Sequence, residues 1–300
     1  MPIDIASYRA WEGRARPAPL AALGIAATTI RRRLRIRIVR IIVFVFLVVS
    51  TGAAALVFYG TLTGRGDPRV QEQIRRFGFE NVDVLAILNR LFDIAIGFWA
   101  FVLAALVGAP VIAEDRRARA LPLYFSRPIG HIDYVLGKAM SAAFFLALLL
   151  IVPRIAMYGM DIAFADAKGA AWDHMPTFLR SCAVGALGVA LFTSLSLGVS
   201  SLFERPAYAA LFLLGLGALL SVTSLFLADV LESPGWLALS PYACVHRIAI
   251  DLLPVPIGLS DDTAALEKLG IGTAWTGYAA WTALGLFVLT LRVRRVEVVT

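Results

Sequence analysis

Long apolar stretches recur along the chain and are separated by shorter polar connections. Six of them are each about 20 residues long, which is the length of a helix that crosses the hydrocarbon core of a bilayer. The spans must be helical, because a lone strand in lipid would leave its backbone polar groups unpaired. The predicted spans are 41–60, 91–113, 135–158, 178–202, 207–230 and 272–291. The pattern therefore predicts an all-α, polytopic membrane protein with a six-helix transmembrane domain over 41–292 and a short tail over 293–300.

The composition requires lipid as a solvent for much of the surface. Of the 300 residues, 59% are hydrophobic and only 16% are charged. A soluble domain is closer to about half apolar and about a quarter charged. A chain of this composition could not hide its apolar surface in a single core, so membrane insertion is expected. The two cysteines are predicted to be unpaired and buried.

The first 40 residues form a polar, arginine-rich segment without a cleavable signal, so the first span is expected to act as a retained anchor. From Pro19 to Arg40, apolar residues recur at helical spacing between arginines. We predict a helix along the inner membrane surface that then bends into the first span. The alternation over 33–38 also permits a strand, which is the weaker alternative. The arginines of this predicted interfacial helix are Arg31, Arg32, Arg33, Arg35 and Arg37.

Basic residues are distributed unevenly between the two sides of the predicted membrane domain. With the N-terminus inside, 18 of the 28 lysines and arginines lie on the inner side, but only 7 of the 21 acidic residues do. An excess of basic residues marks the cytoplasmic side. We therefore predict a multi-pass protein of the cytoplasmic (inner) membrane with both termini in the cytoplasm. Because the arginines flank spans, their excess indicates membrane lipid as a partner and not nucleic acid.

Few residues suggest chemistry. The chain has no Gly-x-x-x-x-Gly-Lys-Ser/Thr phosphate loop, and its three histidines have no metal-ligand spacing, so we predict neither an enzyme nor a bound cofactor or metal. Three charged residues lie at the ends of spans that we expect to face outward: Asp93, Arg154 and Asp229. They are expected either to reach the outer interface or to line an outer vestibule. The absence of ionisable residues near the span midpoints argues against a secondary transporter.

The connection between the second and third spans has the most distinctive sequence. It begins with Glu114 and Asp115, continues with the basic residues Arg116, Arg117 and Arg119, and has apolar residues at Leu121, Leu123 and Phe125 before Ser126, Arg127 and Pro128. Pro128 disfavours helix in the residue before it. We interpret 114–128 as a short amphipathic element at the inner surface, with its charge exposed to a partner.

This connection resembles that of the permease subunits of type-2 ABC exporters (the ABC-2 family). The family pattern has Glu, basic residues, Gly-Thr-Leu, then Ser-x-Pro and a terminal Gly-Lys. The matching residues here are Glu114, Leu121, Ser126, Arg127, Pro128, Tyr134, Gly137 and Lys138, whereas Arg119-Ala120 replaces Gly-Thr. The resemblance extends over the chain, because the family has an N-terminal interfacial helix, six spans and a re-entrant outer element. That element would begin at 239–242, within the apolar outer segment Trp236–Pro254.

The resemblance implies a role for each part. Residues Glu114–Pro128 would be the coupling helix, docked in a groove of a separate ABC ATP-binding subunit that holds ATP and Mg. Two permease protomers, identical or different, would form a path lined by the first, second and fifth spans. The alternatives are a secondary transporter or channel working alone, and a membrane-embedded enzyme or assembly factor. Lipid, peptide, drug, ion and polysaccharide substrates are all compatible with the sequence.

Overall fold

The computed structural model describes residues 18–64, 84–120, 130–163, 170–253 and 266–295, and helices are the regular structure found in them. The helices are α1 (Ala18–Leu34), α2 (Arg37–Gly64), α4 (Val84–Leu103), η2 (Ala104–Gly108), α5 (Pro110–Arg117), α7 (His131–Leu150), α8 (Val152–Ala163), α9 (Ala170–Asp173), α10 (Met175–Leu202), α11 (Pro206–Val230), η3 (Pro234–Leu239), α12 (Pro241–Leu252) and α14 (Ile271–Arg295). The described part of the chain is thus all-α, as predicted.

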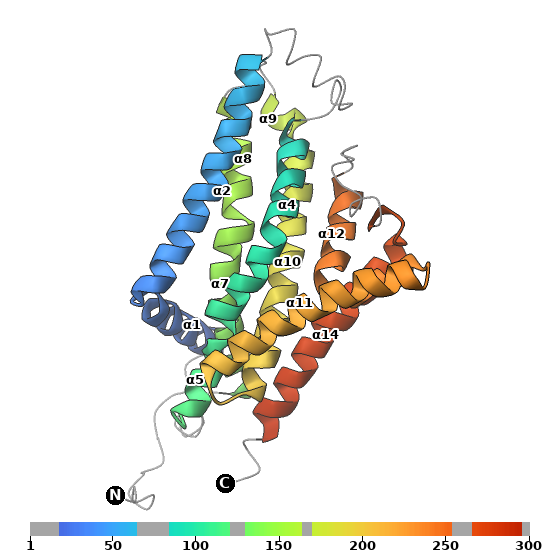
Figure 1. Cartoon of the computed structure of the whole chain (residues 1–300). Helices are drawn as coiled ribbons and strands as arrows, with labels where there is room; N and C mark the ends of the chain where they lie inside the picture. Colours follow the sequence, from blue (N-terminus) through green and yellow to red (C-terminus); the bar gives the residue numbers. More distant parts are fainter. Residues whose placement is uncertain (1–17, 65–83, 121–129, 164–169, 254–265, 296–300) are drawn as a thin grey trace, which may run out of the picture.

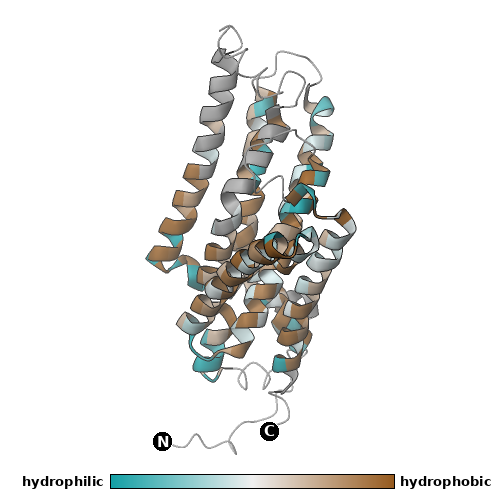
Figure 2. Ribbon diagram, turned by 45° about the vertical axis from the view of Figure 1, so that its right-hand side comes forward, coloured by the Kyte–Doolittle hydropathy of each residue, from teal (hydrophilic) through white to brown (hydrophobic). Residues whose placement is uncertain are grey.

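Four helices are long and apolar enough to cross a membrane: His131–Ala163, Met175–Leu202, Pro206–Val230 and Ile271–Val293. They coincide with the third to sixth predicted spans. The first two predicted spans fall on α2 and on α4–η2–α5, whose side chains are only partly described. Figure 2 shows hydrophobic residues along the length of the long helices. The complete six-span topology stays a prediction.

Two of the long helices are interrupted where prolines remove backbone donors. Between α4 and α5, the N–H of Ala109 bonds to the carbonyl of Ala104 at 2.9 Å, five residues back, just before Pro110. This bond forms the π-helical turn η2. Between α7 and α8, the α-helix is interrupted at Ile151, two residues before Pro153. Uninterrupted spans were predicted at both positions.

The predicted surface helix over Pro19–Arg40 is shorter in the structure. α1 ends at Leu34, Arg35 and Ile36 form a turn, and α2 already begins at Arg37. The strand alternative over 33–38 is wrong, since these residues are helical or in that turn. In Figure 1, α1 lies across one end of the bundle near α5, and the last turn of α14 reaches the same end on the other side. We call this end of the molecule the basal end.

α10 forms the centre of the bundle. Its most apolar stretch is 72% buried, whereas those of α11 and α14 are each 17% buried. Glycines allow the close contact between α10 and α14: a Cβ on Gly198 would lie 2.7 Å from the carbonyl oxygen of Gly285. Such contacts between small residues are typical of helices packed in lipid. The outer faces of α11 and α14 expose large apolar side chains, as lipid or a membrane partner would require.

Candidate functional site

The site is built around α5, the short helix at the basal end from which the 114–128 connection departs. Its first turn is attached to α10 by Ser200, which is fully buried. The hydroxyl oxygen of Ser200 accepts hydrogen bonds from the backbone N–H groups of Ile112 and Ala113, each at 3.0 Å. One side chain therefore fixes the beginning of α5 against the central helix of the bundle.

The three residues that follow on α5 contact three different elements. Successive residues of an α-helix project about 100° apart, so Glu114, Asp115 and Arg116 cannot face the same way. Glu114 faces α1, Asp115 faces α7, and Arg116 faces the turn between α10 and α11. Each forms an ion pair with the element that it faces. The last turn of α5 is thus connected to most of the basal end.

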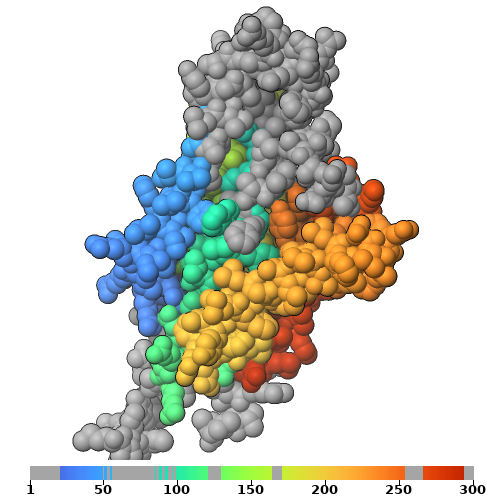
Figure 3. All heavy atoms as spheres, viewed as in Figure 1, coloured from blue at the N-terminus to red at the C-terminus, as the bar shows by residue number. Residues whose placement is uncertain are grey.

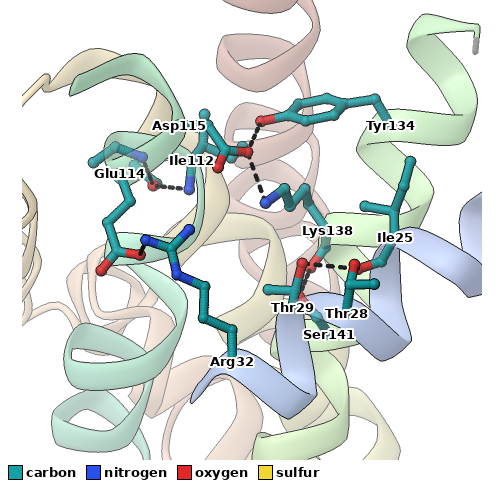
Figure 4. Close-up of polar contacts among 12 residues, drawn as sticks. Ile25, Thr28, Thr29, Arg32, Ile112, Glu114, Asp115, Tyr134, Lys138 and Ser141 are labelled. Atoms are coloured by element: carbon teal, nitrogen blue, oxygen red, sulfur yellow. Dashed lines mark hydrogen bonds and ion pairs between the residues drawn. The ribbon is translucent and has the colours of Figure 1, made fainter. Parts of the chain in front are cut away.

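The contact with α7 is the most buried of the three. The Lys138 ammonium lies 2.7 Å from a carboxylate oxygen of Asp115, with side-chain exposures of 4% and 6%. Tyr134 donates a hydrogen bond from its hydroxyl to the same carboxylate at 2.8 Å. Figure 4 shows Asp115 between these two partners. The predicted exposure of Asp115 to a partner protein is therefore not seen, because this chain already satisfies and covers the carboxylate.

The contact with α1 also uses a buried charge. The Arg33 guanidinium lies 3.0 Å from Glu114, and its side chain is 6% exposed, whereas Arg32 is 3.9 Å away and 70% exposed. Burial lowers the pKa of Arg33, and the Glu114 carboxylate acts in the opposite direction. Arg33 was predicted to lie among surface arginines. It instead anchors the amphipathic helix to α5.

The third contact joins α5 to the hairpin between two candidate spans. Arg116 donates to the backbone carbonyl of Ser201 and lies 3.7 Å from the carboxylate of Glu204. Ser201 lies in the last turn of α10, and Glu204 belongs to the turn that leads into α11. Two elements far apart in sequence are thereby held together beside the 114–128 connection.

The end of α5 shows why the family pattern has a glycine where this chain has Arg119. The N–H of Arg119 bonds to the carbonyl of Arg116 at 3.0 Å, and that of Ala120 bonds to the carbonyl of Asp115 at 2.8 Å. These two bonds define a Schellman motif, whose C′ residue is left-handed and most often glycine. Arg119 adopts this conformation with φ 50°. The turn is retained without the glycine.

The predicted coupling helix Glu114–Pro128 is therefore not one uninterrupted helix. α5 ends at Arg117, and the chain turns at Ala118 and Arg119, which are both exposed. The remaining predicted docking residues lie outside the described part of the chain: Leu121, Leu123, Phe125, Ser126, Arg127 and Pro128. Arg117 and Arg119 are the members of the predicted set whose charges are exposed in the described part.

The Gly-Lys pair at the end of the sequence pattern has a structural role. A Cβ on Gly137 would lie 2.7 Å from the Cβ of Ile25 and 2.8 Å from the carbonyl oxygen of Ala22, so α1 packs directly on α7 at this glycine. The next residue, Lys138, forms the ion pair with Asp115. Gly137 therefore lets α1 approach, and Lys138 connects α7 to α5.

A polar cavity of about 200 Å³ lies where α1, α5 and α7 meet. Thr28 and Thr29 line it from α1, together with the charged residues of the α5 contacts. Both threonine hydroxyls donate to backbone carbonyls of their own helix, at 2.8 to 3.0 Å. The cavity shows that the junction is hydrophilic and leaves room for water between charged groups.

The outer charges were predicted to reach the outer interface or to line a vestibule. Asp93 and Arg154 form an ion pair between α4 and α8, with side-chain exposures of 9% and 1%, and both line a small pocket. Tyr242 of α12 donates to the backbone carbonyl of Asp93 at 3.3 Å. Asp229, at the end of α11, is exposed and does not line this pocket. Asp93 and Arg154 thus form a buried contact among α4, α8 and α12, and the outer vestibule stays a prediction.

Comparison with protein families identifies the chain. The model of the ABC-2 family transporter protein matches residues 23–233. The chain belongs to the ABC-2 family. The match runs from α1 to just beyond α11 and includes all three ion pairs of α5. No curated protein shows a significant match to the chain.

Family membership establishes the general class. ABC-2 proteins are membrane permease components of ABC transporters, and an ABC-2 permease pairs with an ATP-binding subunit. Sequence reasoning did not place Ser200 and Glu204 in the site, and it included Tyr134 and Lys138 only as motif matches. The signal for Lys138 is a lysine inside an apolar span, because such a charge needs a partner. Nothing in the sequence marked Ser200 among the other serines of its helix.

Proposed function

We propose that this ABC-2 permease is the transmembrane subunit of an ATP-driven exporter. The connection after α5 docks on a separate ATP-binding subunit, and ATP and Mg are held there. Two permease protomers form the translocation path across the cytoplasmic membrane, with both chain ends in the cytoplasm. The membrane domain has six spans, and η3 and α12 form the re-entrant outer element before the last one.

One observation carries the coupling role. Glu114, Asp115 and Arg116 tie a single helical turn to α1, to α7 and to the α10–α11 hairpin. A force applied to the connection that follows this turn must therefore act on all of these elements together. Buried ion pairs resist separation, because removing one partner leaves an uncompensated charge. This is the property that a coupling element requires.

The docking surface is proposed to include Arg117 and Arg119 together with the predicted apolar residues that follow them. Both arginines are exposed, whereas Glu114 and Asp115 are occupied by contacts inside the chain. Charge reversal at Arg119 therefore tests docking with less disturbance of the permease fold than reversal at Glu114.

The experiment is affinity purification of the tagged permease from membranes of its own host in mild detergent. Mass spectrometry quantifies the ATP-binding subunit, and the ATPase rate of the complex is measured. Arg119→Glu is expected to lower recovery of that subunit about ten-fold. Arg292→Glu, which reverses an exposed arginine in the last turns of α14, serves as the matched control. Equal recovery from both variants, or transport by permease that lacks any ATPase subunit, would exclude the proposed docking.

A further inference from the structure

An open depression of about 660 Å³ lies at the basal end, between the end of α5 and the start of α11. Its lining consists of Glu114, Arg117, Arg205, Pro206 and Ala207. Figure 3 shows the start of α11 beside α5 on this face, with the rest of α11 running across it. Two arginines from separate elements therefore border one hollow.

The acidic residues beside the depression are already paired with other arginines, so the two arginines of its lining keep their positive charge available. Glu114, the carboxylate of the lining, is already paired with Arg33 at 3.0 Å. Glu204, the nearby acidic residue of the hairpin, is paired with Arg116. Within the described part of the chain, neither Arg117 nor Arg205 forms an ion pair. Both side chains are exposed, so their guanidinium groups are open to an anion.

The position of Arg205 fixes the depth of this site relative to a membrane. α10 and α11 are both candidate spans, and Arg205 lies in the short turn between them, so we expect it at the level of the lipid headgroups. Its guanidinium donates to the Tyr208 hydroxyl at 3.1 Å and lies 5.4 Å from the centre of that ring. A tyrosine paired in this way suits the interface, where one end of the side chain is apolar and the other is hydrated.

Below the arginines, the surface becomes apolar. Tyr208, Leu211 and Phe212 on the first turns of α11 are 52%, 66% and 44% exposed. This apolar strip begins next to the arginines and continues along α11, which crosses the bundle obliquely (Figure 1). The surface thus combines two cations with an adjoining apolar strip, which complements an amphiphile with a phosphate group and a hydrocarbon tail.

We propose that this depression binds the phosphate headgroup of an anionic phospholipid between Arg117 and Arg205, with its acyl chains along α11. The site shares Arg117 with the proposed docking surface, but it goes beyond that function because it needs neither the ATP-binding subunit nor nucleotide and can be tested on the permease alone. Arginine suits the role because its planar guanidinium can donate two hydrogen bonds to one phosphate.

The test is native mass spectrometry of the purified full-length permease, titrated with phosphatidylglycerol and, separately, with phosphatidylcholine. Each arginine near anionic lipid is expected to contribute about a five-fold gain in affinity. Arg117→Gln and Arg205→Gln should therefore each weaken the tightest phosphatidylglycerol site about five-fold, and the double variant about 25-fold. Arg180→Gln with Arg292→Gln, which removes two exposed arginines outside the depression, should leave it unchanged.

The single variants keep the proposal testable if the double variant does not fold. Unchanged phosphatidylglycerol binding in folded single variants would overturn the proposal, and so would equal loss in the control. Displacement of phosphatidylglycerol by 10-fold excess inorganic phosphate would assign the site to a soluble phosphate instead. A stable dimer that excludes the lipid until Arg205 is replaced would assign this face to a second copy of the chain. Because no ATPase readout is used, failure here is separable from failure of the docking experiment.

Discussion

Lys138 and Asp115 form an ion pair at 2.7 Å between α7 and α5, and both side chains are almost completely buried. Glu114 and Arg33 form a similar contact one residue earlier on α5. Together these pairs attach the start of the 114–128 connection to α7 and α1. The charges of Glu114 and Asp115 therefore serve the internal structure, whereas Arg117 and Arg119 are exposed.

Removing one member of the buried pair should be costly. Lys138→Met removes the cation paired with the buried Asp115 carboxylate and leaves the hydrogen bond from Tyr134, so we expect a loss of about 3–5 kcal/mol in the free energy of unfolding. The double variant with Asp115→Leu should recover much of that loss, because no uncompensated charge is left. Unfolding in detergent, followed by tryptophan fluorescence, measures both. A single variant within 0.5 kcal/mol of the parent would contradict the burial of this charge.

Gly137→Ala should separate α1 from α7. The added Cβ would lie 2.7 Å from Ile25 and 2.8 Å from a backbone oxygen, so one helix must move. We expect faster amide hydrogen exchange throughout α1. Gly24→Ala is the matched control on α1, since a Cβ there meets nothing within 4 Å and alanine favours the helix by about 0.5–1 kcal/mol. Similar exchange in the two variants would rule out the close contact.

Arg119→Gly should stabilise the end of α5. Arg119 holds a left-handed conformation that costs a non-glycine residue about 1–2 kcal/mol, and glycine adopts it freely. The glycine variant is expected to raise stability by about 1 kcal/mol, with Arg119→Ala as the control that removes the charge but keeps the strain. If both variants bind the ATP-binding subunit as the parent does, the side chain of Arg119 has no role in docking.

Ser200→Ala should weaken the junction between α5 and α10. It removes the acceptor for two buried N–H groups, of Ile112 and Ala113, with an expected loss of about 1–3 kcal/mol. Ser201→Ala is a close control, because the Ser201 hydroxyl donates to the carbonyl of Gly198 on its own helix and accepts no hydrogen bond from α5 in the described part of the chain. The midpoint of thermal unfolding should be clearly lower for Ser200→Ala than for Ser201→Ala. Equal midpoints would show that Ser200 does not stabilise the junction.

The buried ion pair between Asp93 and Arg154, which lies away from the basal end, leads to another prediction. Arg154→Met removes the guanidinium that pairs with the buried Asp93 carboxylate between α4 and α8, so we expect about 3–5 kcal/mol of destabilisation. Arg154→Lys should not restore full stability, because one ammonium cannot reproduce the guanidinium contacts with Asp93 and the Leu150 carbonyl. Asp229→Asn, an exposed control, should change stability by less than about 0.5 kcal/mol. If replacing Arg154 leaves the stability unchanged, the result would support the predicted position of Arg154 at the outer interface instead.

The sequence by itself determined the all-α class, four of the apolar spans, the amphipathic helix before α2 and the family. These follow from the helical periodicity of apolar residues, the length of the apolar stretches and the composition of the chain. The spans must be helical because every backbone polar group of a membrane span must be satisfied within its own helix. The Glu-to-Gly-Lys pattern covers the segment in which α5 forms ion pairs with α1 and α7, and its coupling role stays a proposal. The predicted bounds of the spans were close to those of α10 and α11, because Pro206 and the short polar turn before it leave few alternatives.

Only the tertiary structure decided which charges are internal and which are exposed. Glu114, Asp115 and Arg116 are alike in sequence context, yet the 100° step between them directs each to a different neighbour. Their partners are up to about 90 residues away, and no local pattern specifies such a distance. The sequence did not predict the pairing of Asp93 with Arg154 for the same reason, since the burial of a charge depends on which helices pack together.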